Sequence, residues 1–129
     1  MKTIARDWVE LAEASFTCLE LLNTQKHKAS LRIICFHCHQ TVKKYLSALQ
    51  EERGTQAARS CNFRVRAKPL LSGSPRWSSI EPALQSLNRY DEDFTYPGHV
   101  ATRTDAREAL KACRSIRSEI RLSLGLNKK

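Results

Sequence analysis

A chain of 129 residues has the length of one domain and can bury a hydrophobic core. Its 41% apolar and 27% charged residues are ordinary for a globular protein, and no apolar run approaches the ~18 residues of a membrane span. The net charge of +9 favours a nucleic acid, a nucleotide or an acidic partner. The N-terminal segment MKTIARDW lacks the apolar core of a signal peptide, so we expect a cytoplasmic protein with reduced thiols.

Two long helices are predicted in the first half of the chain. Apolar side chains at helical spacing predict the first helix over about 3–23 and the second over about 29–52, where Gly54 ends it. The expected inward stripe of the first helix is Ile4, Trp8, Leu11, Ser15, Leu19 and Leu22. That of the second helix is Leu31, Ile34, Cys35, Cys38, Val42, Tyr45, Leu46 and Leu49.

The stretch 55–77 has a different character. It contains no acidic residue but several arginines, together with two prolines and a glycine in KPLLSGSPRW. No helical or strand period persists in it, so we expect an irregular basic loop, with a short strand or turn at NFRVR.

Helical patterns return in the second half. Ser78 or Ser79 is expected to cap a helix that runs towards Tyr90, and a turn-rich connection follows it. Thr102 and Asp105 resemble a capping box for a last helix that ends near Leu124, before Gly125. The predicted fold is therefore a single all-α domain, an antiparallel up-and-down bundle of four main helices.

The segment CFHCH, residues 35–39, concentrates two cysteines and two histidines. Cys35, Cys38 and His39 have spacings that a zinc site could use. No second pair of ligands accompanies them, and Cys35 and Cys38 fall on the apolar stripe, so we interpret both as small core side chains. We predict no metal and no cofactor.

Arg32 and His37 are the candidate catalytic residues. An arginine and a histidine one to two helical turns apart could hold a phosphate and move a proton, as ribonuclease chemistry requires. The alternative is a solvated Arg32 and a histidine that is hydrogen-bonded within the bundle.

Four blocks of sequence together resemble the HEPN domain family. They are DWVELAEASFTCLELL, CFHCHQTVKKYLSAL, SSIEPALQSLNRYDEDFTYPG and TDAREALKACRSIRSEI, in the order in which the family has them. The second block is similar to the family signature FHxQQAxEKxLKAL, and the third ends in a turn similar to RYPG. The similarity covers residues 5 to 124, apart from 55–77.

This resemblance implies a helical bundle that forms homodimers. It also implies a nucleotide-binding or accessory role beside a small nucleotidyltransferase, in systems that behave as toxin and antitoxin. Some family members are metal-independent ribonucleases that use an Arg-His pair, usually near the start of the last helix. That region here offers His99 and Arg103 in the reverse order, so the resemblance does not assign catalysis.

The residues that match the family pattern include four candidate ligand-binding positions: His37, Gln40, Lys44 and Tyr96. The first three recur at helical spacing and can line one groove, where Lys and Gln could hold a phosphate and a base edge. The alternative is that they are polar side chains on the helix surface and form hydrogen bonds across a dimer interface. The chain departs from the pattern at His39, Lys43 and Thr95.

Three functions follow from these patterns. The first is a homodimeric module that binds a nucleotide or a nucleotidyltransferase partner. The second is a ribonuclease toxin that acts on RNA without a metal. The third is a degenerate relative that keeps the fold and binds no ligand.

Overall fold

The computed structural model describes residues 1–25, 30–55 and 60–129. Its elements are five α-helices and two short 3₁₀ helices, and the described residues contain no strand. The elements are α1 (Thr3–Gln25), α2 (Ser30–Arg53), α3 (Phe63–Leu71), α4 (Trp77–Leu87), η1 (Asn88–Tyr90), η2 (Glu92–Thr95) and α5 (Arg103–Ser123). The prediction of an all-α helical bundle is confirmed. No helix in these ranges is long and apolar enough to cross a membrane.

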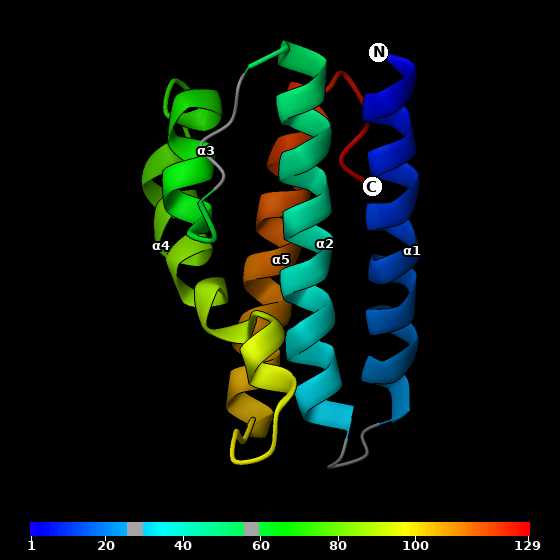
Figure 1. Cartoon of the computed structure of the whole chain (residues 1–129), viewed down its shortest axis with the longest axis vertical. Helices are drawn as coiled ribbons and strands as arrows, with labels where there is room; N and C mark the ends of the chain where they lie inside the picture. Colours follow the sequence, from blue (N-terminus) through cyan, green and yellow to red (C-terminus); the bar gives the residue numbers. More distant parts are fainter. Residues whose placement is uncertain (26–29, 56–59) are drawn as a thin grey trace.

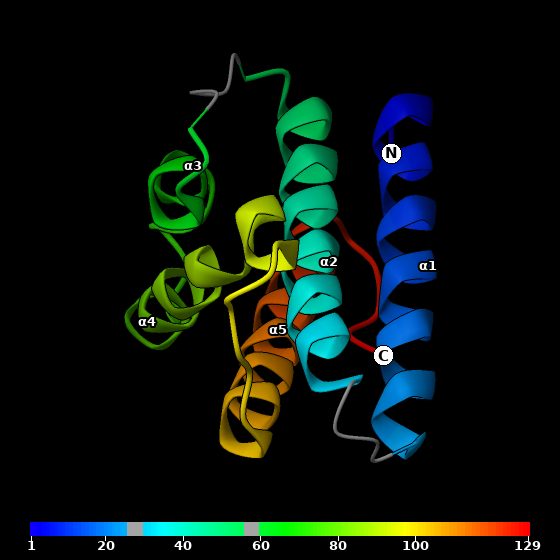
Figure 2. The same cartoon turned by 60° about the horizontal axis from the view of Figure 1, so that its bottom comes forward.

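The central element of the bundle is α2. It runs antiparallel to α1 on one side and packs against α5 behind it, while α3 and α4 cover the flank opposite α1 (Figure 1). The chain between α4 and α5, which contains η1 and η2, also packs against α2 (Figure 2). Side chains that point in different directions from α2 therefore meet different elements.

The predicted stripe of α2 is confirmed, because all eight of its residues are buried. The helix ends at Arg53, and Gly54 follows it with a φ of +64°, a conformation that side chains with a Cβ rarely adopt.

The predicted stripe of α1 is wrong at Ile4 and Leu11, which are exposed. The face that packs on α2 instead uses Ala5, Ala12 and other small or mid-sized residues. Cys18 of α1 is exposed as well. A pattern rich in alanine leaves two helical faces of similar apolarity, so periodicity alone could not choose between them.

The prediction of an irregular loop over 55–77 is wrong where α3 forms, and the predicted strand or turn at NFRVR is wrong as well. Asn62 caps α3 by accepting a hydrogen bond from the Val65 amide at 3.2 Å, and Asn88 accepts one from the Phe63 amide at 2.8 Å. The buried face of α3 is Phe63, Ala67, Leu70 and Leu71. The apolar period of α3 is short and is interrupted by basic residues, so the sequence pattern does not indicate a helix here.

The start of α4 also differs from the expectation, because the helix begins at Trp77 and neither Ser78 nor Ser79 caps it. In contrast, the capping box of α5 is confirmed: the Thr102 hydroxyl accepts from the Asp105 amide at 3.0 Å, and Asp105 accepts from the Thr102 amide at 2.9 Å.

Candidate functional site

Three of the predicted ligand-binding residues share one side of α2. His37, Gln40 and Lys44 recur at intervals of three and four residues, and each is half-buried. The Lys44 ammonium donates a hydrogen bond to the Ser15 hydroxyl of α1 at 2.8 Å. These residues therefore lie beside the seam between α1 and α2.

The same residues carry unused hydrogen-bonding capacity. Within the described ranges, the buried Nδ1 of His37 and Nε2 of Gln40 have no hydrogen-bond partner. Burial lowers the pKa of His37, and the nearby charge of Lys44 lowers it further, so the neutral ring is favoured. Unpaired buried nitrogens are costly in a folded chain and suit contact with a ligand or a second copy.

Exposed apolar side chains occur along the same two helices. Ile4 and Leu11 of α1 and Ile33 of α2 are each about half exposed, at 47%, 51% and 45%. The Ser15–Lys44 contact places these apolar positions on one side of the helix pair. We call this surface the α1–α2 outer face, and it comprises Ile4, Leu11, Ser15, Cys18, Ile33, His37, Gln40 and Lys44.

The opposite side of the same helix pair is occupied by an ion-pair cluster. Arg117 of α5 binds Glu13 through Nε at 2.8 Å and through Nη2 at 2.6 Å, and the Tyr45 hydroxyl donates to Glu13 at 2.5 Å. This side is closed by α5, whereas the α1–α2 outer face has no element over it in the described chain.

Arg32 holds the chain between α4 and α5. Its Nη2 donates to the carbonyl oxygens of Phe94 at 2.9 Å and Tyr96 at 3.0 Å, and its guanidinium lies 5.8 Å from the centre of the Phe94 ring. On an α-helix, residues five apart point about 140° away from each other, and no described contact joins Arg32 to His37. The Tyr96 side chain is exposed.

The cysteines and His39 contact different parts of the bundle. The Cys38 thiol lies against Cys113 of α5, and this contact and burial raise its pKa. Cys35 lies beside Tyr90, and burial raises the pKa of its thiol to about 11. His39 packs on Phe63 of α3 with ring centres 4.4 Å apart. The interpretation of Cys35 and Cys38 as core side chains is confirmed by their complete burial.

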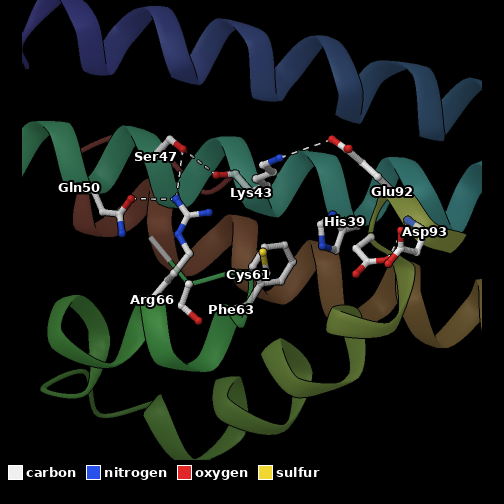
Figure 3. A pocket seen from close by; sticks show the side chains of 11 residues that line it. His39, Lys43, Ser47, Gln50, Cys61, Phe63, Arg66, Glu92 and Asp93 are labelled. Carbon is white, nitrogen blue, oxygen red and sulfur yellow. Dashed lines mark hydrogen bonds and ion pairs between the residues drawn. The ribbon is translucent and has the colours of Figure 1, made fainter. Parts of the chain in front are cut away.

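A pocket that sequence reasoning missed lies between α2 and α3, with η2 at one end (Figure 3). Its volume is about 490 Å³, within the range of small-molecule sites. Figure 3 shows Arg66, Ser47 and Gln50 at one end, and His39, Glu92 and Asp93 at the other. We call it the α2–α3 pocket; the remaining lining residues are Lys43, Ser60, Cys61, Phe63 and Asp91.

His39 is a buried polar residue of the α2–α3 pocket. Only 5% of the residue is exposed, and both ring nitrogens lack a hydrogen-bond partner among the described residues. Burial lowers its pKa to about 4, so the ring is neutral near pH 7 and offers one donor and one acceptor.

Arg66 is the cation of the pocket. Its Nη2 donates to the Gln50 amide oxygen at 2.8 Å and to the Ser47 hydroxyl at 3.3 Å, both neutral partners. It forms no ion pair within the described ranges, and the eight residues outside them include no Asp or Glu. Burial lowers the pKa of Arg66, as expected for a partly desolvated charge without a counter-ion.

One signal for this pocket was present in the sequence. His39 stands where the HEPN signature has glutamine, which marked the position as altered. Arg66 carried no signal because it fell in the stretch interpreted as a loop, and α3 was needed to place it opposite α2.

The fold and the site define the class of protein: an all-helical bundle whose polar candidate groups lie on its central helix. The model of the HEPN domain family matches residues 5–123 of the chain. The protein belongs to the HEPN domain family. No curated protein and no solved structure matches the chain.

Proposed function

We propose that the protein is a homodimeric nucleotide-binding module in which two copies meet through the α1–α2 outer face. The observation that carries this proposal is the combination of exposed apolar side chains and unpartnered polar nitrogens on that face. Isolated apolar side chains are common on surfaces, whereas several of them on one helical face with unpaired buried polar groups are typical of an interaction site. HEPN proteins are often dimeric, which agrees with this use of the face.

The composition of α1 supports a symmetric contact. Leu11, Ala14, Ser15 and Cys18 follow one another at spacings of three, one and three residues, so they share a side of the helix and carry no charge. Small side chains allow two helices to approach closely. A two-fold interface would pair this surface with itself and would cover Leu11 and Ile33 in both copies.

The nucleotide is proposed to bind where His37, Gln40 and Lys44 are neighbours. Lys44 would exchange its contact with Ser15 for a phosphate, while His37 and Gln40 would hydrogen-bond a base edge or a ribose hydroxyl. The exposed ring of Tyr96 is available to stack on a base. The net charge of +9 favours an anionic ligand or an acidic partner such as a small nucleotidyltransferase.

The experiment is titration calorimetry of the wild-type protein with ATP and AMP, together with its molar mass by light scattering. The proposal expects a dimer that binds at least one nucleotide, with binding weakened at least tenfold by Lys44→Ala. Lys111→Ala removes a charge from the solvent-exposed side of α5 and serves as the control. A monomer, or a dimer with no nucleotide affinity at millimolar concentration, would contradict it.

A further inference from the structure

The α2–α3 pocket contains a cation, Arg66, that forms no ion pair within the described chain. The Arg66 guanidinium is partly buried and is bonded only to the neutral side chains of Ser47 and Gln50. A buried charge is costly unless a counter-charge accompanies it. Lys43 also lines the pocket, but its ammonium contacts the exposed Glu92 at 3.9 Å, towards the η2 end (Figure 3). The Arg66 end of the pocket is therefore suited to a phosphate or a carboxylate.

His39, towards the η2 end of the pocket (Figure 3), selects for a polar ring. His39 presents a neutral imidazole with one donor and one acceptor and with no described partner for either nitrogen. Phe63 stacks on it, which holds the imidazole in place. A ligand ring that carries a donor or an acceptor would pair with one of these nitrogens, whereas a hydrocarbon ring would leave both unpaired.

The far end of the pocket is acidic. Glu92 and Asp93 belong to η2, and Asp91 caps η2 by accepting a hydrogen bond from the Asp93 amide at 3.1 Å. Carboxylates here would accept hydrogen bonds from hydroxyl or amino groups and would repel a second anionic group. Arg66 lies at the opposite end of the pocket, whereas the Lys43 ammonium is directed to Glu92 (Figure 3).

From this arrangement we infer that the α2–α3 pocket binds a small anion with a heteroaromatic ring, held by Arg66 at its anionic group and by His39 at its ring. Two sources share this chemistry: a nucleoside monophosphate and a heteroaromatic carboxylate. The first source rests on the nucleotide ligand of the proposed function and would bind here at a second site, separate from the α1–α2 outer face. The second does not depend on that function.

The test is titration calorimetry with AMP, orotate, adenosine and inorganic phosphate against the wild type and four variants. Arg66→Gln removes the charge, and Arg66→Lys restores it. Arg64→Gln is the matched control, because Arg64 lies on the same helix outside the pocket and its charge is already paired with Glu81 at 2.7 Å. His39→Phe removes both ring nitrogens but keeps an aromatic ring against Phe63. Circular dichroism verifies that each variant is folded.

We expect AMP or orotate to bind, with affinity reduced at least tenfold by Arg66→Gln and by His39→Phe. Arg66→Lys should recover part of the affinity, and Arg64→Gln should change it less than twofold. Adenosine and inorganic phosphate should each bind far more weakly than whichever of AMP and orotate binds, because only AMP and orotate carry both a ring and an anionic group. Whether AMP or orotate binds identifies the source of the ligand.

Three results would overturn the inference: no probe binds at millimolar concentration, Arg66→Gln and Arg64→Gln weaken binding equally, or inorganic phosphate binds as well as the ring compounds. Loss of AMP binding in Lys44→Ala but not in Arg66→Gln would remove this inference and leave the proposed function intact. Arg66-dependent binding of orotate without any nucleotide binding would support this inference and contradict the proposed function.

Discussion

At the scale of single residues, His39 and Glu13 show two ways of burying a polar group. His39 is buried as a neutral ring with no described hydrogen-bond partner. Glu13 instead meets Arg117 in a two-point contact and accepts a third hydrogen bond from Tyr45. Although burial alone raises the pKa of Glu13, these hydrogen bonds outweigh it and leave its pKa below the ordinary value.

His39 makes stability depend on pH. Burial lowers its pKa from 6.5 to about 4; the charges of Lys43 and Arg66 lower it too, and that of Asp91 opposes them. Between these pKa values the unfolded chain binds a proton that the folded chain does not, so stability falls as the pH drops from 6.5 to 4. The loss at pH 4.5 is between about 2 and 3 kcal/mol. Urea unfolding at pH 7.5 and 4.5 should show this part of the loss in the wild type and not in His39→Phe. Identical pH dependence in the two proteins would contradict the burial of a neutral His39.

The Glu13–Arg117 pair should contribute more to stability than a surface pair. The Arg117 side chain is 7% exposed, so Glu13→Gln leaves its charge buried without a counter-ion, at a cost of about 2 kcal/mol in the free energy of unfolding. Glu20→Gln removes an exposed pair with Arg114 and should cost less than about 1 kcal/mol. Urea unfolding of both variants measures the difference, and equal losses would show that the Glu13 pair is not specially stabilising.

At the scale of elements, α3 decides whether the α2–α3 pocket exists. It brings Phe63 and Arg66 to face α2, and Arg53 of α2 donates a hydrogen bond to its Leu70 carbonyl at 2.6 Å. The helix has only nine residues and contains Pro69, so its intrinsic stability is low. Its stability comes from the cap at Asn62 and from the burial of Phe63, Leu70 and Leu71 in the core.

The cap of α3 can be tested by itself. Asn62→Ala removes the acceptor for the Val65 amide and should lower the free energy of unfolding by about 1 kcal/mol. Asn62→Asp keeps an acceptor and should change the free energy of unfolding by only a few tenths of about 1 kcal/mol. Chemical denaturation of the two variants gives the values. An alanine variant as stable as the wild type would mean that no helix is capped at this position.

The difference between predicted and observed elements has a physical origin. The long helices could be predicted because 21 to 24 residues carry several turns of periodicity, and both the stripe of α2 and the capping box of α5 are confirmed. For α3, nine residues hold few turns, and the basic side chains of Arg64 and Arg66 point outward or into the pocket. Which face of α1 is buried depends on the helix that packs against it, and the periodicity of the α1 sequence does not contain that information.

At the scale of the whole molecule, two surfaces carry the functional proposals. The α1–α2 outer face could be predicted in part, since helical spacing alone places His37, Gln40 and Lys44 together. The α2–α3 pocket could not, because it depends on the packing of α3 against α2 across an intervening segment. The HEPN family match covers both surfaces but assigns no ligand to either.

The dimer proposed through the α1–α2 outer face can be tested with one charge. Leu11→Glu places a carboxylate at the centre of the apolar surface and should be tolerated by the single chain, because Leu11 is 51% exposed. In a dimer the new charge would be desolvated beside its symmetry mate, which costs several kcal/mol and separates the copies. Val65→Glu makes the same type of change at a 43% exposed position on α3 and is the matched control.

Light scattering coupled to size-exclusion chromatography therefore tests the central claim most directly. The account predicts that the wild type and Val65→Glu have twice the chain mass of 14.7 kDa, and that Leu11→Glu has the mass of one chain. A wild type that has the mass of one chain, or a Leu11→Glu variant that still forms the dimer, would contradict it.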